Sequence, residues 1–196
     1  FGDIFENLGD IFGFGSRRKG QTYQTNINIS FTEAASGIEV VLPLENESIK
    51  VKVPAGVDNG SVIRLRGRGG PGAAGAPDGD LLVQVSVEPH KFFKRSNMDL
   101  ILEVPLLFTE AALGASIRIP TLTKPVTLKI PSGTPSGKTF KIRGEGVAPQ
   151  GRRSGDLYVK VFIIPPTNLS RSAKKHLEKF RDQFESGDSP RKYLDE

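Results

Sequence analysis

The sequence has no cysteine and no tryptophan, and only two histidines. Without cysteine the chain forms neither disulfides nor a thiolate metal site, which favours a reducing compartment and predicts a cytoplasmic location. His90 and His176 lie far apart and do not show the spacing of a metal-ligand set or a nucleophile–base pair, so we expect no metal, no cofactor and no enzymatic activity. No apolar run reaches the ~20 residues that a membrane-spanning helix needs.

What is present is typical of a globular protein with many turns. Hydrophobic residues make up 37% of the 196 residues and charged residues 25%, and there are 22 glycines and 14 prolines. The net charge is +5, and the basic residues cluster at Arg17–Lys19, Arg64–Arg68, Lys138–Arg143 and Arg152–Arg153, where they are interspersed with glycine. Solvated loops account for these clusters, and the alternative is a nucleic-acid-binding module, although no aromatic residues are interleaved to stack on bases.

A tandem repeat organises the chain. The segment Phe31–Gly37 (FTEAASG) recurs as Phe108–Gly114 (FTEAALG). Further matched pairs are Val53-Pro54 with Ile130-Pro131, Arg66-Gly67 with Arg143-Gly144, and Gly79-Asp80-Leu81 with Gly155-Asp156-Leu157. The repeat predicts two similar modules of roughly 70 residues. Since Asp80 and Asp156 follow a glycine at equivalent places, we interpret them as turn-capping residues and not as a catalytic carboxylate pair.

Alternation of side chains predicts strands in both modules. Residues 23, 25, 27, 29 and 31 share one face of the first strand, and Thr32 is the expected N-cap of a single helical turn that ends at Gly37. Further strands are expected at 38–44, 48–53, 62–66 and 80–87, and the second module repeats this order from 100 to 164. The predicted fold is all-β with short helices: two tandem similar β-sandwich or open-barrel domains plus a C-terminal helix.

The expected domain organisation follows from the repeat and from composition. It consists of a Gly/Phe-rich flexible linker (1–20), a first, peptide-binding β-domain (21–88), a connection (89–98), a second β-domain (99–166), and a C-terminal helix and tail (167–196). In the last segment Ser170 is the expected cap of a helix whose apolar stripe comprises Ala173, Leu177, Phe180 and Phe184. This stripe either packs on the second module or pairs with its copy in another chain.

The strand expected at 38–44 is the best candidate for a binding surface. It is apolar on both faces, with Val40, Leu42 and Leu44 on one side and Val41 on the other. Pro43 lacks a backbone donor and suits an edge strand better than a central one. An apolar edge strand is an aggregation hazard unless it is used, and its natural use is β-augmentation by an extended peptide.

Several motifs are those of a known family. They are Phe31–Gly37, Val51–Val57, Ile63–Gly67, Gly79–Val83 and His90–Leu100. With these motifs, nearly the whole chain resembles the C-terminal substrate-binding region of DnaJ-type J-domain co-chaperones, and the opening at 1–20 resembles the Gly/Phe linker of that family.

The resemblance implies a function and a site. In that family a groove on the first of two β-domains holds unfolded polypeptide for delivery to a DnaK-type ATP-driven chaperone, and a C-terminal segment makes a homodimer. Carried over by position, the groove residues are Ile27, Ile29, Val40, Leu42, Leu44 and Val83. The family's zinc-binding insert is missing between Leu44 and Ile49, and the His-Pro-Asp motif of a J domain is absent. We therefore expect a fragment of a zinc-less member, or one with a deletion, that does not itself stimulate ATP hydrolysis.

Overall fold

The computed structural model describes residues 18–44, 48–149 and 151–184. Most of the expected linker at 1–20 lies outside the described residues. So do residues 45–47, which lie in the stretch where the family's zinc insert is missing, and the tail after Phe184, together with the side chain of Phe184.

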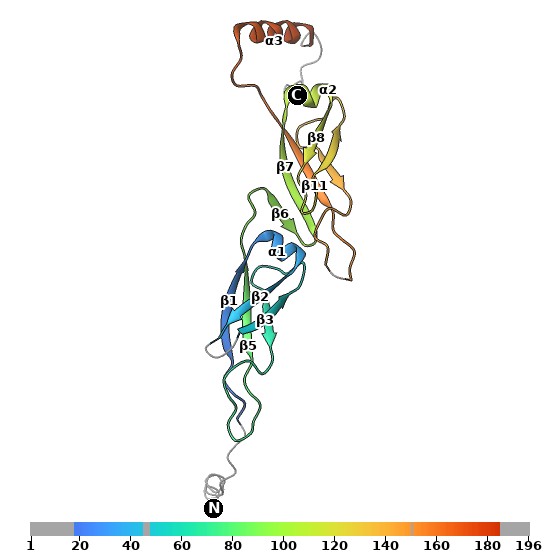
Figure 1. Cartoon of the computed structure of the whole chain (residues 1–196). Helices are drawn as coiled ribbons and strands as arrows, with labels where there is room; N and C mark the ends of the chain where they lie inside the picture. Colours follow the sequence, from blue (N-terminus) through green and yellow to red (C-terminus); the bar gives the residue numbers. More distant parts are fainter. Residues whose placement is uncertain (1–17, 45–47, 150, 185–196) are drawn as a thin grey trace, which may run out of the picture. The chain divides into compact units, whose positions relative to one another are not determined.

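The described chain consists mainly of β-strands. In chain order the elements are β1 (Tyr23–Ile29), α1 (Phe31–Ser36), β2 (Ile38–Pro43), β3 (Ser48–Val53), β4 (Val62–Leu65), β5 (Leu81–Val87), β6 (Phe93–Ser96), β7 (Asp99–Leu107), α2 (Phe108–Leu113), β8 (Ala115–Ile119), β9 (Val126–Ile130), β10 (Thr139–Ile142), β11 (Leu157–Ile164) and α3 (Arg171–Phe184) (Figure 1). The strands form separate sheets in the two modules, and a helix follows at the C-terminus. The fold class predicted from the sequence is confirmed.

The contacts between residues group the chain into two compact units, and the boundary between them passes through β7 and β11. The first unit contains the chain up to Glu103 together with 120–124 and 139–160, and the second contains 104–119, 125–138 and the chain from Val161. The domain boundaries expected from the sequence repeat stay a prediction.

In the first module a three-stranded sheet faces a two-stranded one. The larger sheet has the order β1-β5-β4, in which β1 and β5 are parallel and pair from Tyr23 with Leu81 to Ile29 with Val87. The smaller sheet is the antiparallel pair of β2 and β3, in the register Ile38 with Val53. Parallel pairing is possible because the segment between β1 and β5 supplies the long crossover that parallel strands require.

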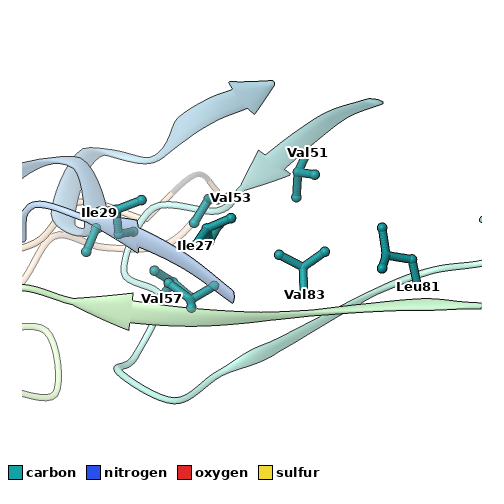
Figure 2. Packing of buried hydrophobic residues seen from close by; sticks show 9 residues of the cluster. Ile27, Ile29, Val51, Val53, Val57, Leu81 and Val83 are labelled. Atoms are coloured by element: carbon teal, nitrogen blue, oxygen red, sulfur yellow. The ribbon is translucent and has the colours of Figure 1, made fainter. Parts of the chain in front are cut away.

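The core of the first module lies between these sheets. Figure 2 shows side chains from β1, β3 and β5 pointing toward one another. The buried residues of this cluster are Ile27, Ile29, Ala34, Val51, Val53, Val57, Leu81, Val83 and Val85. β3 has a strict alternation of exposed and buried residues, as a strand with one solvated face should.

The second module repeats this plan with one added strand. Its larger sheet has the order β10-β11-β7-β6, and β8 pairs with β9 as β2 pairs with β3. β6 lies within residues 89–98, which the sequence predicted to be a connection. It pairs with β7 through a tight turn at Asn97, whose φ is 55°. Asparagine tolerates this left-handed conformation better than most residues. Buried residues include Leu100, Leu106, Ile130, Leu157 and Val159.

Helix α1 begins two residues earlier than a Thr32 cap requires. The expectation that Thr32 caps α1 is wrong: the N-cap is Ser30, whose Oγ accepts the Glu33 N–H at 3.3 Å. The Glu33 carboxylate in turn accepts the Ser30 N–H at 2.7 Å, which completes a capping box. Gly37, with φ of 79°, ends the helix in a conformation that a side chain would disfavour.

The C-terminal helix α3 is capped as predicted, because the Ala173 N–H donates to Ser170 Oγ at 3.1 Å. Ala173 and Leu177 on its apolar side are half-buried, whereas Phe180 is 45% exposed. The Phe180 ring meets the Phe108 ring edge-to-face, with centroids 6.0 Å apart.

Candidate functional site

The candidate binding feature of the first module is the free edge of β2. Among the described residues β3 is the only ladder partner of β2, so the opposite edge of β2 carries unpaired backbone groups. Pro43 ends the strand, consistent with the predicted edge position. Such an edge is a ready template for another extended chain.

The two faces of β2 differ. Val40 and Leu42 are half-buried and pack against the core, as does Leu44 just after the strand. Val41 lies on the outer face and is 56% exposed. On that face Glu39 Oε1 also pairs with Lys50 Nζ at 3.1 Å, so charged groups flank Val41. A peptide that seeks apolar contact therefore finds it on the Leu42 side of the edge.

The residues that the family resemblance implies as groove residues all belong to one cluster, but they differ in accessibility. Ile27 and Ile29 on β1 and Val83 on β5 are buried core residues, and Val83 has no exposed surface at all. Val40, Leu42 and Leu44 keep exposed surface beside the free edge. The role of all these residues in peptide binding stays a prediction, and only the second group has exposed surface that a ligand could reach.

A cavity of about 1040 Å³ opens near the beginning of β2. Ile38, Glu39, Val53 and Pro54 of the first module contribute to its lining, whereas Leu42 and Leu44 do not. The surface beside Leu42 and Leu44 is therefore a shallow strip along a strand edge and not part of this cavity.

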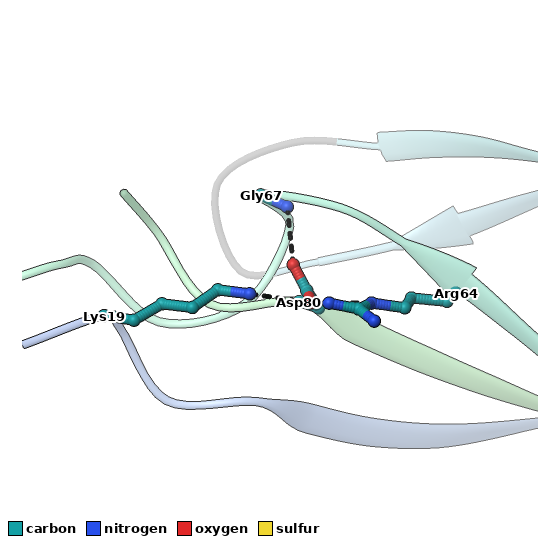
Figure 3. Close-up of polar contacts among 4 residues, drawn as sticks. All are labelled: Lys19, Arg64, Gly67 and Asp80. Carbon is teal, nitrogen blue, oxygen red and sulfur yellow. Dashed lines mark hydrogen bonds and ion pairs between the residues drawn. The ribbon is translucent and has the colours of Figure 1, made fainter. Parts of the chain in front are cut away.

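Asp80, just before β5, joins several segments of the first module through its side chain. Its carboxylate accepts hydrogen bonds from Lys19 Nζ (2.9 Å), Arg64 Nε (2.7 Å) and the Gly67 N–H (3.1 Å), as Figure 3 shows. The hydrogen bond from Lys19, then that from Gly67 and the pairing with Arg64, hold the pKa of Asp80 well below its usual range. Asp80 therefore stays ionised and acts as a structural clamp, in agreement with the turn-capping interpretation.

The equivalent Asp156 has the same role. It accepts hydrogen bonds from Lys141 Nζ (2.6 Å) and the Gly144 N–H (2.8 Å). The hydrogen bond from Lys141 and then that from Gly144 lower the pKa of this carboxyl group, and the charge of Arg143 adds to the effect. Neither aspartate is placed as a general acid or base.

The glycine-rich loop after β4 is filled by the chain itself. The Gly69 N–H donates to Gly79 O at 3.0 Å, and the Gly70 N–H donates to Gln21 O at 2.8 Å. A Cβ atom on Gly79 would lie only 1.8 Å from Gln21 O, so the glycine permits close backbone packing. Because these N–H groups already have backbone acceptors, they are not available to bind a phosphate.

An aromatic cluster after β5 was not anticipated from the sequence. The rings of Phe31, Phe92 and Phe93 surround His90, at centroid distances of 5.4, 4.4 and 5.0 Å from its ring. His90 Nδ1 accepts the N–H groups of Phe92 and Phe93. The neighbouring aromatic residues in His90–Phe93 are the only signal for it, and the arrangement indicates a packing role for His90.

Other kinds of site find no support in the described part of the chain. It contains no group of three or more histidine, aspartate or glutamate side chains arranged to hold a metal ion. None of the helices within it is long and apolar enough to cross a membrane.

Comparison with protein families agrees with this architecture. The family model described as DnaJ C terminal domain matches residues 23–166, which begin with β1 and end just after β11. This domain is a non-catalytic chaperone module, and DnaJ proteins generally work with client polypeptides and DnaK-type chaperones. Because the match covers most of the chain and both modules, the protein belongs to the DnaJ family and comprises its C-terminal domain.

Proposed function

We propose that this chain holds non-native polypeptides along the free edge of β2 and presents them to a DnaK-type chaperone. The observation that carries the proposal is the unpaired edge of β2 beside the half-buried Val40, Leu42 and Leu44. An extended client segment adds its backbone to the edge, and its apolar side chains cover this strip.

The expected affinity is moderate. Burial of two leucine-sized side chains contributes about 3 to 6 kcal/mol before the costs of ordering the client are subtracted. Backbone pairing adds binding energy that does not depend on the client's sequence. The result is weak, releasable binding, as a protein that passes clients onward requires.

The test compares neighbouring positions on one strand. Leu42→Asp places a charge on the contact side of β2, whereas Val41→Asp places it on the outer face and serves as the matched control. We expect Leu42→Asp, and more strongly its combination with Leu44→Asp, to lose capture of an unfolded client, while Val41→Asp retains it. Binding is measured by fluorescence anisotropy, and folding of each variant by circular dichroism.

Leu42 also packs against the core, so a milder variant guards against unfolding. Leu42→Ala removes apolar contact area without adding charge and should weaken capture in a folded protein. The proposal is wrong if folded Leu42→Asp or Leu42→Ala protein captures the client as well as the unmodified chain, or if Val41→Asp loses as much affinity.

The proposal includes a homodimer formed through the C-terminal segment. The exposed ring of Phe180, and Leu169 just before α3, support it, because apolar surface of this kind is characteristic of association sites. Deletion of Leu169–Glu196 should convert a dimer to a monomer by light scattering. A dimer that persists after the deletion would exclude a required role for this segment.

The absence of cysteine supports a cytoplasmic setting for this activity. The nucleic-acid alternative is weakened at the first module, because Lys19 and Arg64 are both bound to Asp80.

A further inference from the structure

We propose that the second module carries a separate site for the carboxylate groups of an acidic polypeptide segment, between Arg143 and Arg153. A cavity of about 710 Å³ lies there. It is lined by Lys141, Arg143, Gly144, Arg153, Ser154 and Asp156. This inference does not depend on the free edge of β2, because no residue of β2 lines the cavity.

The two modules of the repeat show why this region is open. In the first module three groups bind Asp80, including Lys19 from the chain before β1, and the Asp80 side chain is only 5% exposed. In the second module the described donors to Asp156 are Lys141 and Gly144, and its side chain is 23% exposed. No second cation among the described residues occupies the place that Lys19 holds in the first module.

The charges around the cavity do not balance. Asp156 pairs with Lys141 and so neutralises that cation locally. Within the described residues the guanidinium groups of Arg143 and Arg153 make neither an ion pair nor a hydrogen bond, although both line the cavity and the charge of Arg143 acts on Asp156. Three cations thus surround one carboxylate, and the excess of 3 − 1 = 2 positive charges is available to an anion from outside.

Arginine and serine together suit carboxylates. A guanidinium group donates parallel hydrogen bonds to the two oxygens of a carboxylate, and the Ser154 hydroxyl offers a further donor. The cavity volume lies within the range of roughly 300 to 1,000 Å³ that is usual for ligand pockets. It therefore has room for the neighbouring carboxylates of a short acidic segment.

A peptide fits these observations better than a nucleic acid. No aromatic ring lines the cavity, so there is no platform on which a base would stack. Two arginines also fall short of the continuous row of cations that follows a phosphate backbone. We therefore assign the site to a polypeptide segment with neighbouring carboxylate side chains.

The experiment uses the whole chain and a fluorescein-labelled probe peptide, Gly-Ser-Glu-Glu-Glu-Ser-Gly. A second peptide with glutamine in place of glutamate controls for charge. The test variant is Arg143→Gln with Arg153→Gln, and the control is Arg118→Gln, which removes an exposed cation from β8 of the same module. We expect the double substitution to weaken binding about tenfold or more, because it removes hydrogen bonds to charged groups. The Arg118 control should change binding less than about twofold.

Each further outcome decides between interpretations. The glutamine peptide should bind at least about tenfold more weakly than the glutamate peptide, and added salt should weaken binding of the latter. The proposal is overturned if the double variant binds the glutamate peptide normally, or if both peptides bind equally. It is also overturned if a single-stranded oligonucleotide binds at these arginines more tightly than the peptide does.

The two proposals fail separately. Leu42→Asp should retain the acidic peptide while it loses apolar clients, and the Arg143/Arg153 double variant should show the reverse. A Leu42→Asp protein that loses both ligands while folded would indicate one shared surface and overturn the assignment of a separate site.

Discussion

Substitution of Val83 tests whether the buried residues of the predicted groove, Ile27, Ile29 and Val83, contact clients or only support the core beneath β2. Val83 lies on β5 without exposed surface and belongs to the same core cluster as Ile27 and Val51. Val83→Ala removes two methyl groups, which costs about 1.6 kcal/mol in transfer free energy. A residual cavity of roughly 40 Å³ adds about 1 kcal/mol, so we expect the free energy of unfolding of this module to fall by about 2.5 kcal/mol.

The assay separates stability from binding. Hydrogen exchange of the amides in β1 and β5 reports the stability of the first module alone. Affinity for an unfolded client is measured on the folded variant by fluorescence anisotropy. Because a fully buried side chain offers no surface to a ligand, we expect the dissociation constant to change less than about twofold. Val159→Ala is the matched control, since Val159 is the equivalent fully buried residue on β11.

The opposite result would refute this reasoning. If Val83→Ala weakens client binding about tenfold while exchange in β1 and β5 stays unchanged, Val83 contacts the client and the core opens to admit it. If Val159→Ala weakens client binding to the same extent as Val83→Ala, the effect is not specific to the first module.

Three further predictions concern stability. The hydrogen bonds from Lys19 and Gly67 and the pairing with Arg64 lower the pKa of Asp80 in the folded state, so the ionised carboxylate stabilises the fold above its unfolded-state pKa. This contribution should be lost as pH falls below about 4. In acid unfolding, Asp80→Asn should therefore reduce the loss of stability in that pH range. Gly79→Ala should strongly destabilise the first module in urea unfolding, because its Cβ would meet Gln21 O at 1.8 Å, and normal stability would show that the loop packs differently. Ser30→Ala should lower the unfolding free energy by about 1 kcal/mol, and an unchanged value would argue against the capping box.

The sequence predicted the features that depend on local patterns. Alternation of side chains located the strands, and the repeat indicated that both modules share one plan. Ser170 was correctly identified as a cap, because an N-cap acts through a residue only a few positions away. The edge position of β2 followed from Pro43 and from an apolar surplus on the strand.

Features that depend on distant segments were not predictable in the same way. The parallel pairing of β1 with β5 joins the two ends of the first module, and no local pattern encodes it. The segment of β6 was predicted to be a connection because β6 is short, and its partner β7 follows after the turn at Asn97. The N-cap of α1 is different, because Thr32 and Ser30 are both able to cap a helix and the local spacing Ser30-x-x-Glu33 of a capping box favours Ser30, a signal that the Thr32 prediction overlooked.

The parallel ladder between β1 and β5 also sets the order of events during biosynthesis. Since β5 runs from Leu81 to Val87, β1 can pair with it only after the whole segment from Ile29 to Val87 has left the ribosome. Contacts between segments so distant in sequence slow folding. Until then the nascent chain exposes the apolar residues of β1, so under the proposed function the protein passes through a stage at which it resembles its own clients.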